Sequence, residues 1–151
     1  RGANDCFAYK GFQIIKITLP SKKEFFIVNT HMDAGRRDSD RSSRKKQLDH
    51  IVSTISQQMT TKALIVAGDL NLHSKNSEDV KLLKKFKKEL KLTDAFKVHK
   101  ISEKWSILDY ILYRQGNEVE FKTISVGEDK SFVTEEGPLS DHPALFIEIS
   151  I

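Results

Sequence analysis

The stretch LIVAGDLNLH, residues Leu64–His73, joins a run of aliphatic residues to a group of polar side chains. The aliphatic run is short and continuous, which is typical of a strand that is buried on both faces. Asp69, Asn71 and His73 follow it at alternate positions, and Gly68 allows the chain to turn there. Two interpretations are open: an ordinary turn at the end of a strand, or the floor of an active site.

The composition indicates one globular domain. The sequence has 151 residues, of which 38% are hydrophobic and 30% charged, and its formal net charge is +4. These values are ordinary for a soluble chain that can bury a core, and the charge slightly favours anionic partners. The single cysteine, Cys6, excludes an internal disulfide. No apolar run approaches the roughly 18 residues that cross a bilayer, and the composition does not choose between a cytoplasmic and a secreted protein.

Hydrophobic periodicity predicts an alternation of strands and helices. Strands are expected over residues 11–20, 23–31, 62–69, 107–114, 119–127 and 144–151. Helices are expected after the second and third of these strands. This order predicts an α/β (α+β) fold with mixed, mostly antiparallel sheets and flanking helices.

Each predicted helix has an apolar stripe. The stripe of the first helix consists of Leu48, Ile51, Val52, Ile55 and Met59, with Ser42 or Ser43 as the expected cap. Before it, residues 33–46 are so polar that an exposed loop is expected. The second helix, over residues 77–90, is expected to bury Val80, Leu83, Phe86 and Leu90 and to expose five lysines.

Four polar clusters lie at the ends of the predicted strands or within them. They are NTHMD (residues 29–33), GDLN (68–71), LDYIL (108–112) and SDHPAL (140–145). Each cluster alone is also typical of a turn, a strand end or a loop. Together they supply hard oxygen ligands and proton-transfer groups, which the hydrolysis of a phosphate ester requires.

Other chemistries lack their motifs in this sequence. It has no glycine-rich phosphate loop ending in Gly-Lys-Ser or Gly-Lys-Thr, so phosphoryl transfer from a nucleotide is not expected. No Cys and His spacing fits zinc, and no nucleophile elbow of the Gly-x-Ser-x-Gly type occurs.

In their order along the chain, the four clusters resemble the C-terminal half of the endonuclease/exonuclease/phosphatase superfamily, which has the deoxyribonuclease-I-like fold. The resemblance implies about half of a four-layer α/β/β/α sandwich, with residues 1–151 as the C-terminal part of one domain. The family's earlier asparagine and metal-binding glutamate have no counterpart here, so the N-terminal half of the domain is expected to be absent. A sheet exposed in this way would favour self-association.

The resemblance also implies a role for each polar residue. Asp69, Asn71 and Asp141 would bind Mg²⁺, with Mn²⁺ as an alternative, and Asp69 and Asn71 would also align the attacking water. The remaining catalytic residues would be His31, which contacts the scissile phosphate, His142, which exchanges a proton, and Asp109, which fixes the tautomer of His142.

These residues act on the phosphate itself, so the substrate has to be inferred from surrounding segments. YKGF (residues 9–12), THMDAG (30–35) and LDYILYR (108–114) resemble the sphingomyelinase branch. The expected function is therefore Mg²⁺-dependent hydrolysis of a phosphodiester, with a lipid head group favoured. The alternatives are an endonuclease or exonuclease that acts on DNA or RNA, and an inactive binding module on the same fold.

Overall fold

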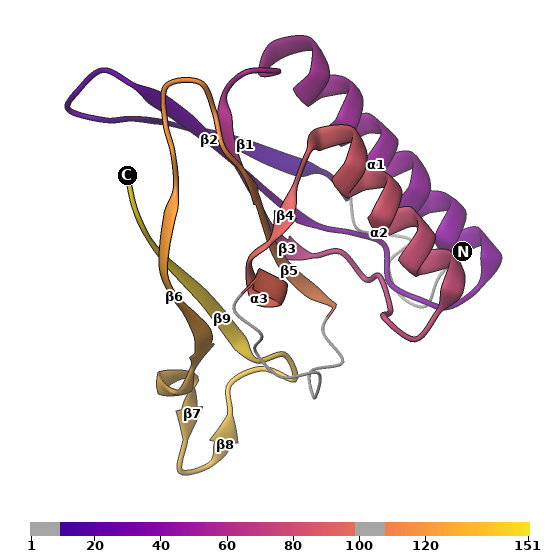
Figure 1. The fold of residues 1–151 in the computed structure, drawn as a ribbon. Coiled ribbons are helices and arrows are strands. Elements are labelled where there is room, and N and C mark those ends of the chain that lie inside the picture. Colours follow the sequence, from indigo (N-terminus) through magenta and orange to yellow (C-terminus); the bar gives the residue numbers. More distant parts are fainter. Residues whose placement is uncertain (1–9, 99–107) are drawn as a thin grey trace.

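A computed structural model describes residues 10–98 and 108–151 of the chain (Figure 1). Cys6 and the beginning of the strand expected at residue 107 lie outside these ranges. The larger elements, in chain order, are β1 (Phe12–Thr18), β2 (Glu24–His31), α1 (Asp38–Gln58), β3 (Ala63–Asp69), α2 (Ser77–Leu90), β5 (Asp109–Arg114), β6 (Lys122–Asp129) and β9 (Ala144–Ser150). The short ones are β4 (Thr93–Asp94), α3 (Ala95–Val98), η2 (Lys130–Phe132), β7 (Val133–Thr134) and β8 (Gly137–Pro138).

The main sheet has five strands in the order β1-β2-β3-β5-β4. Strands β2 and β3 are parallel, and the other neighbouring pairs are antiparallel. Helix α1 connects β2 to β3, because a parallel pair needs a crossover between its strands. The mixed, mostly antiparallel sheet that the sequence predicts is confirmed.

Two apolar layers hold the described chain together. On one face of the main sheet, Val66 and Leu112 pack with Ile51 of α1 and Phe86 of α2. On the other face, a second core contains Phe25, Ile65 and Ile111. Residues Val126, Leu145, Ile147 and Ile149 of β6 and β9 pack against this second core.

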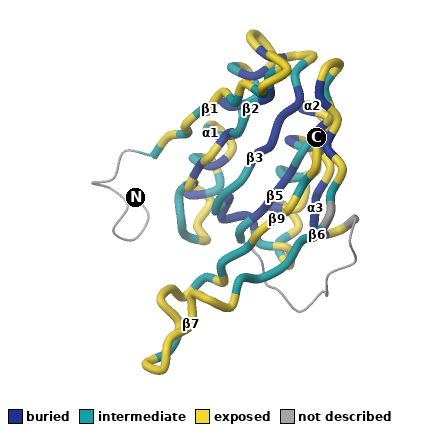
Figure 2. The backbone as a smooth tube through the Cα atoms, turned by 90° about the vertical axis from the view of Figure 1, so that its left-hand side faces the viewer, coloured by how far each residue is buried: buried dark blue, intermediate teal, exposed yellow. Residues whose placement is uncertain are grey.

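The described residues therefore form three layers: the two helices, the main sheet and the smaller β6–β9 sheet (Figure 1). Figure 2 shows that β3 and β5 run through the buried centre, whereas the segment around β7 is exposed. The α/β class is confirmed. Among the described residues, no helix is both long and apolar enough to cross a membrane.

The exposed loop predicted over residues 33–46 is wrong for most of its length, because α1 begins at Asp38. Neither Ser42 nor Ser43 caps the helix; instead the Asp40 carboxylate accepts the backbone N–H of Arg37 at 2.9 Å. Asp40 and Arg44 are buried and continue the stripe of Leu48. Because these two positions are charged, the first turns of the helix have no apolar periodicity in the sequence.

The inward face of α2 differs from the predicted one for the same reason. Val80 is 45% exposed, and its neighbour Asp79 is buried. Asp79 forms an ion pair with Arg44 of α1, with 3.3 Å between Asp79 Oδ1 and Arg44 Nη2. Phe86 and Leu90 are buried as predicted, and among the five lysines only Lys87 is partly covered.

Candidate active site

The strand register places three of the predicted site residues in one row across the main sheet. His31 ends β2 opposite Asp69, which ends β3. Asp69 in turn lies opposite Asp109, the first residue of the antiparallel strand β5. The carboxyl ends of β2 and β3 therefore meet the amino end of β5 at a single edge of the sheet.

His142 reaches this row from the loop that precedes β9. Its Nδ1 lies 2.6 Å from Asp109 Oδ2 and 4.0 Å from Asp69 Oδ2. The hydroxyl of Ser140 accepts the backbone N–H of His142 at 3.1 Å, which fixes the turn that carries the ring. The predicted contact between Asp109 and His142 is present, and it connects the smaller sheet to the edge of the main sheet.

Asp69 lies between two histidines. Its Oδ2 is 3.5 Å from His31 Nε2, on the side opposite its partner strand β5. The side chain of Asp69 is 13% exposed and that of His31 is 63% exposed, so His31 lies on the outer side of the site. Burial raises the pKa of Asp69 above its ordinary value, and the nearby Asp109 carboxylate adds to the increase, whereas the Asn71 N–H opposes it.

The turn after β3 positions Asn71. Asp69 Oδ1 accepts the backbone N–H of Asn71 at 2.7 Å, and Asn71 has a φ of 49°. The Asn71 amide donates from Nδ2 to the carbonyl of Met32 at 3.1 Å, so its side-chain oxygen is the polar atom that remains for a ligand. The stretch LIVAGDLNLH therefore forms a tight turn, and that turn places Asn71 next to Asp69.

Gly68 makes the tight turn possible. Its φ is +130°, and a Cβ atom added there would lie 2.0 Å from the carbonyl oxygen of Thr30 on the neighbouring strand. A side chain would therefore force β2 and β3 apart at the point where His31 and Asp69 must lie side by side.

His142 and the two carboxylates form a compact group of ionisable side chains. The hydrogen bond to Asp109 raises the pKa of His142 above its ordinary value, because the carboxylate favours the protonated ring. Asp69, Asp109 and His142 each offer a ligand atom, and these atoms lie within 4.8 Å of one another. Carboxylate oxygens are the ligands that Mg²⁺ prefers, so the donor chemistry of the group fits a divalent cation.

Asp141 immediately precedes His142 but is not a member of this group. It is exposed, and the described three-residue group consists of Asp69, Asp109 and His142 without it. Its role as a metal ligand stays a prediction, as do the roles inferred for the other site residues.

Tyr110 follows Asp109 in β5 and was not among the residues predicted for the site. Its hydroxyl donates to the carbonyl of Leu72 at 2.8 Å, and its ring is buried in the core beneath the helices. Burial raises the pKa of Tyr110 to about 12, so the hydroxyl stays protonated. The LDYIL segment carried a signal for this contact, since a tyrosine beside a strand-borne aspartate has a polar end that must find a partner when buried.

The structure is a mixed α/β scaffold with carboxylates and histidines gathered at one edge of the main sheet. The family model described as "Endonuclease/Exonuclease/phosphatase family 2" matches residues 1–106. The chain belongs to this family.

Individual relatives agree with this assignment. A sphingomyelinase of Mycobacterium tuberculosis is 27% identical over 155 aligned residues, which cover 93% of this chain and 30% of that relative. Thus the chain spans about a third of the length of the curated relatives it matches.

Solved structures show the same fold. D. rerio TDP2 in complex with a single-strand DNA product superposes with a TM-score of 0.72 at 16% identity, covering 94% of this chain and 62% of that one. A beta toxin variant from Staphylococcus aureus with bound magnesium ions superposes with a TM-score of 0.53 at 16% identity, covering 92% of this chain and 54% of that one.

Proposed function

We propose that the protein hydrolyses a phosphodiester by means of a water molecule activated at the edge of the main sheet. The observation that carries this proposal is the row His31, Asp69, Asp109, completed by His142 from the second sheet. The row combines two carboxylates with two imidazoles in a partly buried site. Such a set can orient a water molecule, accept its proton and place donors on phosphoryl oxygens.

Each residue has a separate task in this proposal. Asp69 accepts a hydrogen bond from the attacking water, and its raised pKa makes it a stronger base than a free carboxylate. His142, held by Asp109, donates to a phosphoryl oxygen as negative charge develops there. His31 is exposed at the outer side of Asp69 and contacts the same phosphate.

A divalent cation, Mg²⁺ or Mn²⁺, would supply neutralisation of the phosphoryl charge when bound. Asp69, Asn71 and Asp141 are the proposed ligands. The magnesium ions in the similar beta toxin support this proposal, as does the carboxylate chemistry of the group.

The favoured substrate is a lipid phosphodiester of the sphingomyelinase type. The curated relatives named sphingomyelinase support it. The second candidate is a nucleic acid, which is favoured by a cleft lined by Arg36, Arg41 and Lys75 and by the DNA product in the similar TDP2 structure. An inactive binding module on the same fold is the remaining alternative.

We also propose that residues 1–151 are the C-terminal part of one larger domain. The coverage of 54–62% of the solved neighbours supports this, together with the small two-stranded sheet that forms the third layer. In such a domain, strands from the N-terminal part would extend the smaller β6–β9 sheet.

Calorimetric titration with Mn²⁺ separates an active centre from an inactive module. We expect saturable heat with the unchanged chain and none with Asp69→Asn, which keeps the shape of the side chain and removes its charge. Glu78→Gln removes an exposed charge elsewhere and is expected to bind as the unchanged chain does. Equal heats from all three proteins would contradict the proposed cation site.

Two activity assays on one preparation separate the two substrate candidates. Hydrolysis of sphingomyelin supports the lipid candidate, and nicking of a plasmid supports the nucleic-acid candidate.

A further inference from the structure

A cleft of about 500 Å³ opens beside the proposed active site. Its walls are Arg36 and Arg41 from the start of α1, residues 73–76 from the loop before α2, and Leu108 from the segment before β5. Leu108 immediately precedes Asp109, and its carbonyl accepts the backbone N–H of Leu70 at 2.9 Å. The cleft, which we call the basic cleft, therefore adjoins the segments that carry Asn71 and Asp109, and its volume lies in the range of small-molecule sites, about 300–1,000 Å³.

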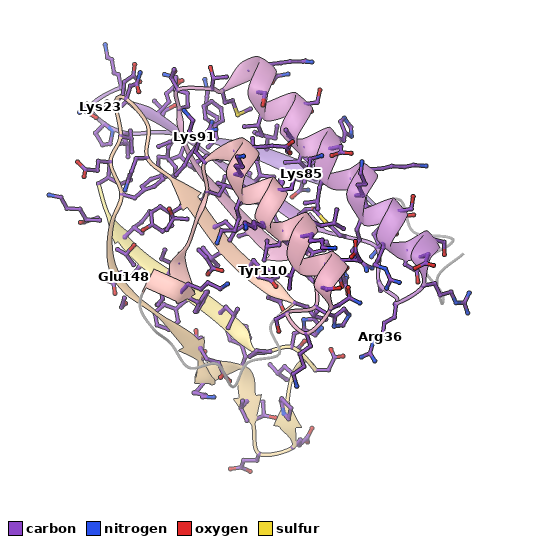
Figure 3. All side chains as sticks on the ribbon, turned by 45° about the vertical axis from the view of Figure 1, so that its right-hand side comes forward. Lys23, Arg36, Lys85, Lys91, Tyr110 and Glu148 are labelled. Carbon is purple, nitrogen blue, oxygen red and sulfur yellow. The ribbon has the colours of Figure 1, made fainter. Side chains whose placement is uncertain are left out.

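The charges of the basic cleft do not cancel. Asp79 is the acidic residue of the lining, and its carboxylate is paired with Arg44, whose side chain is completely buried. Arg41 forms an ion pair with the exposed Asp38. Arg36 and Lys75 are exposed and form no ion pair with any described residue. Figure 3 shows Arg36 extending outward from the loop at the amino end of α1. Two cationic side chains are thus available to an anion.

The helix termini add to this positive potential. Helices α1 and α2 both begin at this edge of the main sheet (Figure 1), so the positive ends of both helix dipoles face the cleft region. Some backbone N–H groups at these ends are already bonded: Asp40 accepts the N–H of Arg37, which precedes α1, and the Asn76 side chain accepts those of Glu78 and Asp79. An anion in the cleft would therefore be bound by side chains, mainly the guanidinium of Arg36 and the ammonium of Lys75.

The loop that carries Lys75 is held in place. Asp79 Oδ2 accepts the backbone N–H of His73 at 3.1 Å, and the His73 carbonyl accepts the N–H of Asn76 at 3.0 Å. Arg44 fixes the opposite loop by donating to the carbonyl of Gly35 at 2.9 Å. The buried pair Arg44–Asp79 thus stabilises both loops that line the cleft. Arg36 and Lys75 therefore extend from backbone that is held by hydrogen bonds.

We propose that the basic cleft binds a second phosphoryl group carried by the substrate, separate from the phosphodiester that is hydrolysed. This inference rests on the proposed function, because the second group belongs to a molecule whose phosphodiester lies at Asp69 and His142. Guanidinium groups bind phosphoryl oxygens in pairs, and ammonium groups bind them as point charges. A choline phospholipid has one phosphate only, so a second phosphoryl site favours the nucleic-acid candidate, in which each successive nucleotide carries a phosphoryl group, over the lipid candidate.

The binding test uses the 151-residue chain and pyrophosphate as the probe, followed by amide NMR. We expect saturable shifts at residues 73–76. Arg36→Ala and Lys75→Ala should each raise the Kd about tenfold, the loss typical of one charge-assisted contact. Lys84→Ala removes an equal charge from the exposed face of α2, away from the cleft lining, and should leave the Kd unchanged. Equal weakening by all three substitutions, or no saturable binding, would overturn the proposal.

The kinetic test compares two chromogenic diesters: the p-nitrophenyl ester of thymidine 5′-phosphate, and the same compound with a second phosphate on the 3′ oxygen. Arg36→Ala should raise the KM of the doubly phosphorylated compound about tenfold and leave that of the other unchanged. An equal change for both compounds would contradict a second phosphoryl site. If the unchanged chain hydrolyses neither compound, the proposed function fails, whereas the pyrophosphate titration still decides whether the cleft binds a phosphoryl group.

Discussion

At the scale of single residues, the pair Asp109–His142 sets the charge of the site. The two side chains are 2.6 Å apart, and the carboxylate keeps the imidazole protonated to a higher pH than usual. A group whose pKa is raised by folding stabilises the folded state below its unfolded pKa, and this contribution is lost as the pH rises through the folded value. The pair should therefore stabilise the chain below the ordinary histidine value of 6.5 and progressively less above it.

Asp109→Asn tests this dependence. The amide cannot attract the protonated ring as the carboxylate does, so the pKa of His142 should fall, as measured by the titration of its ring protons in NMR. The loss of thermal stability on going from slightly acidic to alkaline pH should become smaller in the same variant. A pKa of His142 that stays the same would show that the pair does not exist in solution.

Gly68 is the residue whose replacement should disturb the site through the backbone. Gly68→Ala places a methyl group 2.0 Å from the Thr30 carbonyl at a φ of +130°, and we expect a loss of about 2 kcal/mol or more in the free energy of unfolding. Gly11→Ala is a matched control, because no atom lies within 4 Å of the added Cβ. Urea denaturation of both variants measures the difference. Equal stability of the two variants would contradict the tight contact between β2 and β3.

At the scale of elements, the buried pair Arg44–Asp79 fastens α1 to α2. Asp79→Ala would leave the Arg44 charge buried without its partner, and the usual cost of such a change is about 3–5 kcal/mol. The double variant Arg44→Met, Asp79→Leu should lose less, because it removes both charges together. Glu78→Ala at the neighbouring exposed position should cost at most about 1 kcal/mol. Urea denaturation measures the free energy of unfolding of all three variants. An Asp79→Ala variant as stable as the control Glu78→Ala would contradict the role of the pair.

The same pair explains which elements the sequence could reveal. The strands were predictable because their apolar runs alternate with turns, and β1, β2, β3 and β9 lie close to their expected bounds. The start of α1 was not predictable from apolar periodicity, since its first inward positions are Asp40 and Arg44. Charged side chains at buried positions show no hydrophobic stripe, and only the three-dimensional structure shows that they satisfy each other.

At the scale of the whole molecule, the site is assembled from segments that are distant in the sequence. The residue types of the site were predictable from their order along the chain, whereas their convergence depends on the register of β2, β3 and β5 and on the packing of β9 behind the sheet. The basic cleft was not predictable, because it combines two loops whose proximity follows from the parallel arrangement of α1 and α2. From the sequence, the net charge of +4 favoured an anionic partner but gave no location for its binding site.

The proposed function is tested most directly by the rate at which this chain hydrolyses bis(p-nitrophenyl) phosphate with Mg²⁺ present, compared with the rate of His142→Ala. Removing a donor to an oxygen on which negative charge develops typically lowers the rate by about 100-fold or more, so we expect metal-dependent hydrolysis by the unchanged chain and a loss of that size in the variant. Lys84→Ala should retain the full rate. A His142→Ala variant that keeps the rate of the unchanged chain would contradict catalysis at this edge of the sheet.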